Sequence, residues 1–354
     1  MSELIIHTDG GSRGNPGPSA AGFTLAKTDG TQLQAKAFFL GHATNNVAEY
    51  TAVVKALEAA KQADAKQLTL YSDSELLVRQ VNGQYNVKSE QIKPLFRQAV
   101  TLLGGFEKWK VEHVTRDKNK QADELVNRAL NLGQDVDMSS ILSATTRTKP
   151  IRLGVLISGG GRTLMNILEY INYGWLNAKV VLVISSRSTA AGVEKARAAG
   201  LDVKIVRKKD LPNIDRFSEK IEQELTAAKV DLVVQGGWLC LWKIPPRYEN
   251  RVMNIHPALL PSFGGKGMWG AHVHEAVLAA GCKVSGCTVH FCTNQYDKGP
   301  IIIQRCCQVE ETDSAETLAA RVFQQECIAY PQAIKLFAEN KLFVQNGKVI
   351  IRCV

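Results

Sequence analysis

Cysteine is absent from the first 239 residues of this 354-residue chain, and all eight cysteines follow. None of them forms a C-x-x-C pair, so we expect no zinc site. We also expect no disulfide framework, because the sequence shows no export signal. Long hydrophobic runs are missing too: no stretch approaches the ~20 apolar residues of a membrane-spanning helix. The N-terminal sequence MSELIIHTDGG has no basic segment of the signal-peptide type. We therefore expect a reduced, cytoplasmic protein that does not enter a membrane.

Acidic residues are in the minority, and the net charge of +9 is unevenly distributed. Residues 1–149 contain 18 Lys and Arg against 16 Asp and Glu, whereas residues 150–354 contain 25 against 18. The second part therefore carries +7 of the +9. Nucleic acids and small phosphorylated molecules could both use this charge, so composition leaves the partner open.

The length and the change of pattern near residue 150 predict two domains. In the first, alternation and helical spacing predict strands at 4–8, 21–27, 68–72 and 109–115, and helices at 47–63, 74–82 and 121–132. A turn-rich stretch from Asp9 to Pro18 separates the first two strands. We expect an α+β domain with antiparallel strands over residues 1–133.

Segment 134–150 is polar and aperiodic and ends in Pro150, which predicts a linker. After it, uninterrupted apolar runs at 151–157, 180–184, 203–206 and 231–234 alternate with amphipathic helical stretches. Such runs are typical of parallel strands that are covered on both faces. We expect a doubly wound α/β domain with a mostly parallel sheet over residues 151–354.

Four carboxylates of the first block stand where strands meet helices: Asp9, Glu49, Asp73 and Asp123. Hydrolysis of a phosphodiester by two metal ions uses carboxylates that hold the ions ~3.5–4 Å apart, one ion activating water and the other stabilising the leaving oxygen. Hard carboxylate oxygens favour Mg²⁺ or Mn²⁺ over zinc. The pattern predicts a two-metal nuclease site in which all four side chains are catalytic metal ligands.

The sequence around these carboxylates resembles the ribonuclease HI family. The matching motifs are DGGSRGNPG from Asp9, TNNVAEY ending at Tyr50, YSDS ending at Ser74 and NKQAD ending at Asp123. The resemblance covers residues 1 to about 133 and implies a ribonuclease H-like domain that cleaves the RNA strand of an RNA–DNA hybrid. It also implies contacts with the RNA 2′-hydroxyls and backbone by Gly10, Gly11, Asn15 and Asn45.

Two features depart from that family. Many members carry a loop histidine about ten residues before the last aspartate, whereas the loop 116–120 has none and His113 falls in a predicted strand. A basic, tryptophan-bearing insertion that some members use to grip the hybrid is also missing, since residues 83–93 contain only Lys88 and Lys93 as basic residues. The alternative is a catalytically silent domain that binds nucleic acid.

In the second block, Asn254, His256 and Asp297 suit the transfer of a formyl group onto an amine. The reaction passes through a tetrahedral intermediate with an oxyanion, so the site needs a donor for that oxygen and an acceptor for the amine proton. Asn254 can supply the donor. We expect Asp297 to hold the imidazole of His256 charged and, through water, to accept the proton.

Segments NIHPALLPSF from Asn254, GCTVHF from Gly286 and DKGPII from Asp297 closely resemble the folate-dependent formyltransferases. The strand, glycine loop and helix LGVLISGGGRTL from Leu153 resembles the glycinamide ribonucleotide formyltransferases, in which this loop binds the ribotide phosphate. Arg162 stands where the family often has a smaller polar residue, and His290 matches a position beside the active site. The resemblance runs from about residue 151 to 345 and implies 10-formyltetrahydrofolate as co-substrate. It implies ribotide binding by Gly159, Gly160, Gly161, Arg162, Thr163, Ile255, Pro257 and Glu326, and folate binding by Leu239, Cys240, Leu241, Trp242 and Asp297.

Two related enzyme classes share this chemistry. Methionyl-tRNA formyltransferases have an additional C-terminal domain and lack the glycine loop, whereas only 57 residues follow Asp297 here. Formyltetrahydrofolate hydrolases normally begin with a small regulatory domain that the first block does not resemble. We therefore expect a bifunctional enzyme acting on glycinamide ribonucleotide with 10-formyltetrahydrofolate, and on RNA–DNA hybrids with Mg²⁺ or Mn²⁺.

Overall fold

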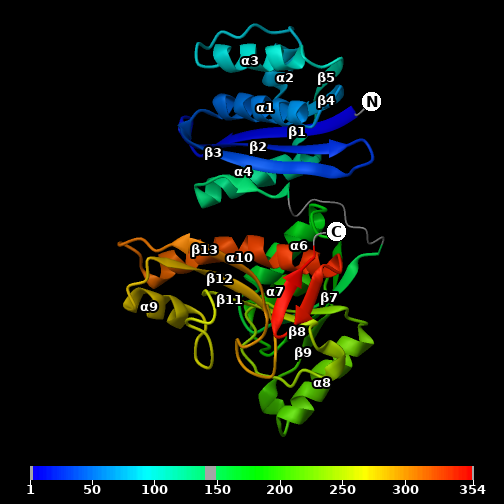
Figure 1. Cartoon of the computed structure of the whole chain (residues 1–354), viewed down its shortest axis with the longest axis vertical. Coiled ribbons are helices and arrows are strands. Elements are labelled where there is room, and N and C mark those ends of the chain that lie inside the picture. Colours follow the sequence, from blue (N-terminus) through cyan, green and yellow to red (C-terminus); the bar gives the residue numbers. More distant parts are fainter. Residues whose placement is uncertain (1–2, 140–148, 353–354) are drawn as a thin grey trace. The chain divides into compact units, whose positions relative to one another are not determined.

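The computed structural model describes residues 3–139 and 149–352, which form two compact units divided near residue 144 (Figure 1). Each unit has its own sheet and its own core, and each is described by itself. Within the described ranges, no helix has the length and apolar character needed to cross a membrane.

The first unit is built on a six-stranded mixed sheet of order β5-β4-β1-β2-β3-β6. Neighbours from β1 through β2 and β3 to β6 are antiparallel, as predicted, whereas β1, β4 and β5 are parallel. The strands are β1 (Glu3–Ser12), β2 (Gly17–Lys27), β3 (Gln32–Ala43), β4 (Gln67–Ser72), β5 (Lys108–His113) and β6 (Val136–Asp137).

Helices cover both faces of this sheet, with α1 and α3 on one side and α4 on the other (Figure 1). The side chains of Thr44 and Ser74 accept hydrogen bonds from the first turns of α1 and α2, which fixes where those helices begin. The helices are α1 (Asn45–Gln62), α2 (Glu75–Val81), α3 (Lys93–Leu103) and α4 (Lys120–Leu132).

Three local predictions differ from the structure. The residues after Thr8 were expected to form a turn. In the structure β1 instead continues to Ser12, and Asp9 pairs with Gly22 of β2. Strand β3 and helix α3 were not predicted. The expected linker starts inside the first unit, since β6 pairs with β3 and Met138 is fully buried; residues 140–148 of that segment lie outside the described residues.

The second unit is doubly wound around a seven-stranded, mostly parallel sheet of order β13-β12-β11-β10-β7-β8-β9, which confirms the predicted class. Strands β7 to β11 run parallel, and β12 and β13 are antiparallel additions at one edge. The strands are β7 (Ile151–Ile157), β8 (Ala178–Ser185), β9 (Val203–Ile205), β10 (Leu232–Gln235), β11 (Val252–His256), β12 (Val284–Phe291) and β13 (Ile301–Gln308). The helices are α6 (Arg162–Asn172), α7 (Ala191–Ala198), α8 (Ile214–Ala227), α9 (Ala271–Ala279) and α10 (Ala315–Ala338), and a hairpin of β14 (Leu342–Gln345) and β15 (Lys348–Ile351) follows.

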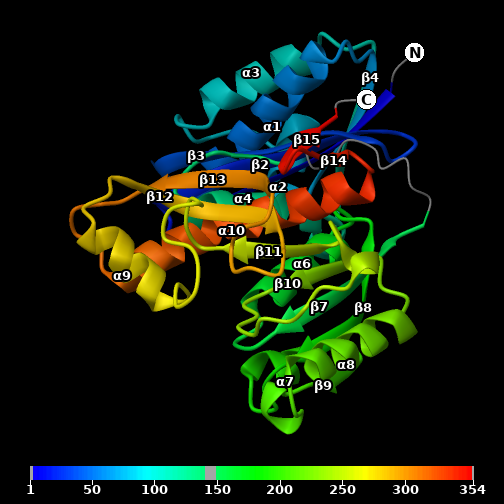
Figure 2. The ribbon, with the colours of Figure 1, turned by 60° about the horizontal axis from the view of Figure 1, so that its bottom comes forward.

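The order of the strands places a ligand crevice in this second sheet. From β7 the chain adds β8 and β9 on one side, and then β10 and β11 on the other (Figure 2). Such a reversal separates the loops that leave neighbouring strands, so ligands bind there at the carboxyl ends. The glycine loop 159–161 follows β7, and His256 ends β11, so both predicted parts of the transferase site meet at this edge.

Candidate active sites

A cavity of about 570 Å³ opens at the carboxyl ends of β7, β10 and β11. It is lined by all the residues that the sequence assigned to catalysis, ribotide binding and folate binding in this unit. These are Gly159, Gly160, Gly161, Arg162, Thr163, Leu239, Cys240, Leu241, Trp242, Asn254, Ile255, His256, Pro257, Asp297 and Glu326. Residues from five separate segments are therefore brought to one space.

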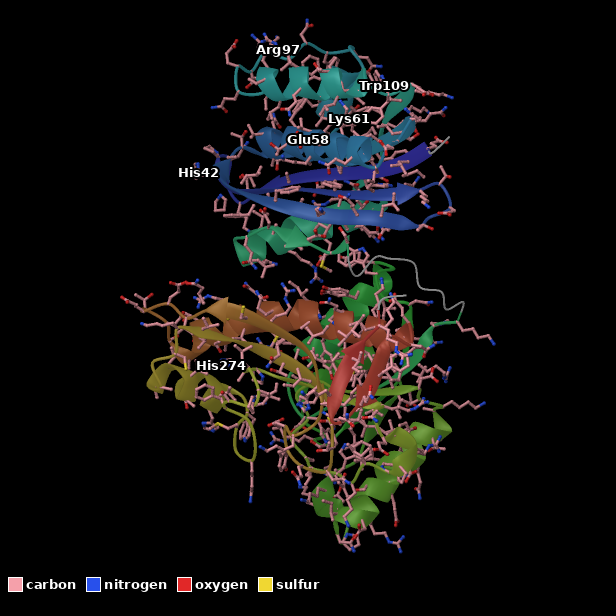
Figure 3. All side chains as sticks on the ribbon, in the orientation of Figure 1. His42, Glu58, Lys61, Arg97, Trp109 and His274 are labelled. Atoms are coloured by element: carbon pink, nitrogen blue, oxygen red, sulfur yellow. The ribbon has the colours of Figure 1, made fainter. Side chains whose placement is uncertain are left out.

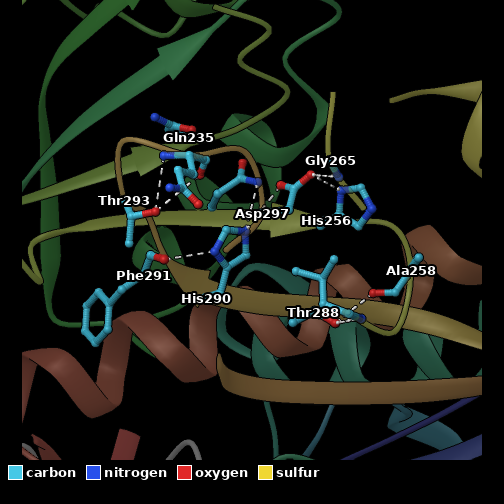
Figure 4. A network of polar contacts seen from close by, with 12 residues as sticks. Gln235, His256, Ala258, Gly265, Thr288, His290, Phe291, Thr293 and Asp297 are labelled. Carbon is cyan, nitrogen blue, oxygen red and sulfur yellow. Dashed lines mark hydrogen bonds and ion pairs between the residues drawn. The ribbon is translucent and has the colours of Figure 1, made fainter. Parts of the chain in front are cut away.

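Asn254 is held in place from the neighbouring strand β12. In the sheet register it lies between Gln235 of β10 and His290 of β12. The Nδ1–H of His290 is donated to the carbonyl of Phe291 at 2.9 Å, which leaves Nε2 to accept from the Asn254 Nδ2 at 3.3 Å (Figure 4). This fixes the orientation of the amide, whose Nδ2 carries a second hydrogen for a ligand oxygen.

The imidazole of His256 is bonded on one side and faces a carboxylate on the other. Its Nε2–H is donated to the carbonyl of Phe263 at 2.7 Å, and its Nδ1 lies 3.6 Å from the Asp297 Oδ2 (Figure 4). Burial lowers the pKa of His256 and outweighs the raising effect of Asp297. The prediction that Asp297 keeps His256 charged in the free protein is therefore wrong.

Asp297 sits in the loop between β12 and β13 with a left-handed φ of 54°, which aspartate tolerates better than most residues. Its Oδ2 accepts the Gly265 N–H at 2.9 Å, and its Oδ1 lies 3.6 Å from the His290 Nε2. Burial raises the pKa of Asp297, but the neighbouring His290 and the hydrogen bond from the Gly265 N–H bring it below its ordinary value. The carboxylate is thus kept ionised inside the cavity.

The glycine loop is held against the start of α7. Gly161 has a φ of 71°, and a Cβ on it would lie 2.8 Å from the Gly192 Cα. The Gly192 N–H and the Lys195 Nζ donate to the carbonyls of Gly159 and Gly160, each at 3.0 Å. With these carbonyls tied back, the N–H groups of the first turn of α6, which have no acceptor inside the helix, form a phosphate cradle.

Some lining residues were missed by the sequence reasoning. Lys266, Met268 and Trp269 belong to the glycine-rich segment 264–270, and Phe323 lies on α10 one turn before Glu326. Burial raises the pKa of Glu326 to about 7, an effect that the charge of Arg162 reduces. The run GGKGMWG directly after the NIHPALLPSF motif was the available signal for the first group.

In the first unit, the four predicted carboxylates line a cavity of about 320 Å³. Asp9 lies within β1, Glu49 on α1, Asp73 directly after β4 and Asp123 in the first turn of α4. Of the four residues predicted to contact nucleic acid, Gly10, Gly11 and Asn45 line this cavity. The fourth, Asn15, is not among the lining residues, but its Oδ1 accepts the backbone N–H of the lining residue Asn45 at 3.1 Å.

Gly10 and Gly11 also have a packing role. A Cβ on Gly10 would lie 2.1 Å from the Glu49 backbone nitrogen, and one on Gly11 would lie 2.9 Å from a methyl group of Val126 on α4. Only glycine lets β1 approach α1 and α4 this closely. The two glycines therefore bring Glu49 and the start of α4 up to Asp9.

The carboxylates strongly influence one another. Burial, followed by the charges of Asp73, Asp123 and Glu49, raises the pKa of Asp9 to about 8. Asn119 donates to the Asp73 Oδ1 at 2.9 Å, and Asn45 donates to the Glu49 Oε1 at 2.8 Å. A divalent cation would offset the clustered charge. The oxygen-only donor set fits Mg²⁺ or Mn²⁺, although no three acidic, histidine or cysteine side chains of the described chain already converge on one ion position.

Arg116 is among the lining residues of this cavity that the sequence reasoning missed. It lies in the loop where many ribonucleases HI carry a histidine, and its Nη2 is 2.5 Å from the Asp123 Oδ1. His113 ends β5 and is not among the residues that line the cavity, which fits the structural role expected of it. The signal for Arg116 was its position in the loop just before the NKQAD motif.

The comparisons with known proteins agree with this division. Residues 151–334 match the formyl transferase family model, and residues 7–129 match the reverse transcriptase-like model. The chain is similar to the trifunctional purine biosynthetic protein adenosine-3 of Gallus gallus, with 32% identity over 63% of this chain and 22% of that protein. It is also similar to glycinamide ribonucleotide transformylase 1 of Symbiobacterium toebii (40% identity, TM-score 0.55, 58% of this chain and 95% of that one). A third similar structure is ribonuclease H1 of Halobacterium salinarum (39% identity, TM-score 0.36, 36% of this chain and 98% of that one). This chain therefore belongs to the formyl transferase family, with a ribonuclease H-like unit in front of its transferase unit.

Proposed function

We propose that the second unit transfers the formyl group of 10-formyltetrahydrofolate to the amine of glycinamide ribonucleotide. The observation that carries this is the single cavity in which the Asn254, His256 and Asp297 side chains lie between the glycine loop and the segment 239–242. The loop suits the ribotide phosphate, and the apolar wall of Leu239, Leu241 and Trp242 suits a flat pterin ring.

In the proposed reaction, the amine nitrogen attacks the formyl carbon and the carbonyl electrons move onto oxygen. The Asn254 amide, oriented by His290, donates to that oxyanion. The ionised Asp297 accepts the proton that the amine loses and can pass it to Nδ1 of the neutral His256, which faces it and becomes a stronger base as negative charge develops beside it. The electrons on oxygen then return to the carbonyl, the carbon–nitrogen bond to the folate breaks, and this same proton goes to the folate nitrogen.

The test is formylation of glycinamide ribonucleotide with 10-formyltetrahydrofolate by the whole chain and by Asn254→Ala and Asp297→Asn variants. We expect kcat to fall by about 10²- to 10⁴-fold in each, because a donor or a proton acceptor of the transition state is lost. A matched control is Asn294→Ala, whose side chain caps the backbone N–H of Ile244 outside the reacting groups. Wild-type activity on methionyl-tRNA and none on the ribotide would contradict the proposal.

For the first unit we propose hydrolysis of the RNA strand of RNA–DNA hybrids. Asp9, Glu49, Asp73 and Asp123 would hold two Mg²⁺ or Mn²⁺ ions, which supply the activated water and stabilise the leaving oxygen. Gly10, Gly11 and Asn45 line this site, Asn15 is hydrogen-bonded to Asn45, and all four are proposed to contact the RNA strand. The arrangement of all four carboxylates around one cavity supports this function.

The experiment is Mg²⁺-dependent cleavage of a labelled hybrid by the wild type and by Asp73→Asn, with hybrid binding measured alongside. We expect the variant to bind but not to cleave. Glu90→Gln, which alters an exposed carboxylate paired with Lys93, is the control and should cleave normally. Binding without any cleavage by the wild type would show that the unit is a nucleic-acid-binding module.

A further inference from the structure

Tyr330 of α10 bridges strands β10 and β11 where they reach the transferase cavity. Its side chain is fully buried, and its hydroxyl oxygen lies 3.0 Å from the carbonyl oxygen of Gln235 and 2.8 Å from that of Met253. Burial raises the pKa of Tyr330 well above its ordinary value, so the hydroxyl keeps the proton that it donates. A carbonyl oxygen has two lone pairs and can accept this proton in addition to a bond of the sheet ladder. One buried donor therefore ties two neighbouring strands together.

The two carbonyls belong to the backbone around Asn254. Met253 directly precedes Asn254 on β11, and Gln235 is the partner of Asn254 in the register of β10. Both Gln235 and Asn254 line the cavity. His290 holds the amide of Asn254 at its tip, whereas Tyr330 holds the backbone from which that side chain starts. The two contacts are complementary, because a side chain with a fixed tip is still displaced if its strand moves.

Helix α10 is fastened close to Tyr330. Pro331 follows inside the helix and has no N–H to donate to the carbonyl of Cys327, four residues earlier. That carbonyl accepts the Nδ2–H of the buried Asn166 on α6 at 3.0 Å. Helix α10 also packs against α9, on which the buried His274 lies (Figure 3). The helix is therefore attached to α6 within one turn of the tyrosine, which fixes where the hydroxyl meets the strands.

The same helix joins the separate parts of the cavity. Glu326 lies four residues before Tyr330, so both side chains are on one face of α10, and Glu326 lines the cavity. Helix α6 directly follows the glycine loop 159–161. The bonds of α10 to α6 and to the two strands therefore set how the loop, Glu326 and Asn254 are spaced. An oxyanion donor acts on an atom that is charged only in the transition state, so a displaced Asn254 should lower kcat more than it weakens binding.

We propose that Tyr330 is a positioning residue for formyl transfer, which holds Asn254 in place for the oxyanion through the carbonyls of Gln235 and Met253. This inference rests on the proposed transfer of a formyl group to the ribotide. Tyr330 is not among the described residues that line the cavity, so it acts through the backbone and not by touching a substrate.

The experiment compares the wild type with Tyr330→Phe, which removes only the hydroxyl group. We would measure kcat, and KM for glycinamide ribonucleotide and for 10-formyltetrahydrofolate, and repeat the substitution in the Asn254→Ala background. The matched control is Tyr248→Phe, since Tyr248 is similarly buried but belongs to the hydrophobic core of this unit. Hydrogen–deuterium exchange of peptides covering 232–236 and 252–256 supplies a readout that does not depend on catalysis.

We expect Tyr330→Phe to lower kcat by about 5- to 20-fold and to change each KM by less than about twofold, as the loss of one buried hydrogen bond away from the substrates implies. In the Asn254→Ala background the same substitution should change kcat by less than about twofold, because the amide through which it acts is gone. Exchange in both peptides should be about 5- to 10-fold faster in Tyr330→Phe. Tyr248→Phe should match the wild type in kcat and in the exchange of both peptides.

An equal loss of kcat with and without the Asn254 side chain, or no loss at all, would overturn the inference while leaving the transferase function standing. If the wild type does not formylate the ribotide, the proposed function fails. Faster exchange of both peptides in Tyr330→Phe would then still support the bridge between the strands, and unchanged exchange would overturn it.

Discussion

Replacing Gly10 with alanine tests the close backbone contact beside the proposed nuclease site. The new Cβ would lie 2.1 Å from the Glu49 nitrogen and 2.4 Å from the Ala48 carbonyl carbon, and both are backbone atoms. No side-chain rotation can relieve such contacts, so α1 must move away from β1. Restoring an ordinary separation of about 3.4 Å requires a displacement of about 1.3 Å.

Overpacking of a core costs about 1–3 kcal/mol, and a clash with backbone belongs at the upper end of that range. For a unit of this size, about 3 kcal/mol corresponds to a fall in Tm of roughly 10 °C. Glu49 moves with α1, and a displacement of about 1 Å of a catalytic group can lower a rate by about 100-fold. We therefore expect Gly10→Ala to lower both the stability of the first unit and hybrid cleavage.

The assay is calorimetric unfolding of the whole chain, together with hybrid cleavage and formyl transfer at 25 °C. Gly104→Ala is the control, because Gly104 has a helical φ of −63° and an added Cβ would meet its neighbours at an ordinary 3.6 Å. The control should change stability by less than about 1 kcal/mol, and neither variant should alter formyl transfer. The reasoning is refuted if Gly10→Ala unfolds at the same temperature as Gly104→Ala and cleaves hybrids normally.

Two further outcomes follow from charged groups in the cavities. Arg116→Ala removes the ion pair with the Asp123 carboxylate, so the Mg²⁺ concentration for half-maximal cleavage should fall by up to about fivefold. The control is Arg79→Ala, which breaks an exposed ion pair with Glu75 elsewhere in the unit and should leave the Mg²⁺ requirement unchanged. An unchanged Mg²⁺ requirement in Arg116→Ala would contradict competition between Arg116 and the metal. Because the pKa of Glu326 is raised to about 7, this carboxylate gains its charge as pH rises through 7, and its repulsion of the ribotide phosphate should raise the KM for the ribotide between pH 6 and pH 8. This step in the pH profile should disappear in Glu326→Gln, and its persistence would assign it to another group.

Motif spacing predicted which residues lie close together within each segment, because the residues of one motif are short-range neighbours. NIHP places Asn254 and His256 two residues apart on one strand, so both side chains emerge at the same carboxyl end. The doubly wound sheet was predicted from the apolar runs, which are also local features of the sequence. The strand order brings the motifs together at one cavity. That order depends on long-range pairing, which general topological rules constrain but do not determine.

The errors have physical causes too. DGGSRGNPG is rich in turn residues, yet pairing with β2 and the close approach of α1 and α4 keep Asp9 to Ser12 extended. In this case tertiary packing overrode local preference. Arg116 was missed because its ion pair with Asp123 depends on how the loop packs against α4, which the sequence alone does not show.

The protonation states of the transferase cavity show most clearly what sequence cannot supply. Asp297 and Glu326 are both carboxylates in one cavity, but the neighbouring His290 and the Gly265 N–H lower the pKa of Asp297, whereas Glu326 has only the charge of Arg162 to oppose its burial. His256 lies next to Asp297 and still has a lowered pKa, because the loss of solvent outweighs one neighbouring charge. Environments that separate the pKa values of like groups assign their roles. The proposed reaction therefore uses Asp297 as its ionised proton acceptor, and Glu326 is the carboxylate whose charge should respond to pH near 7.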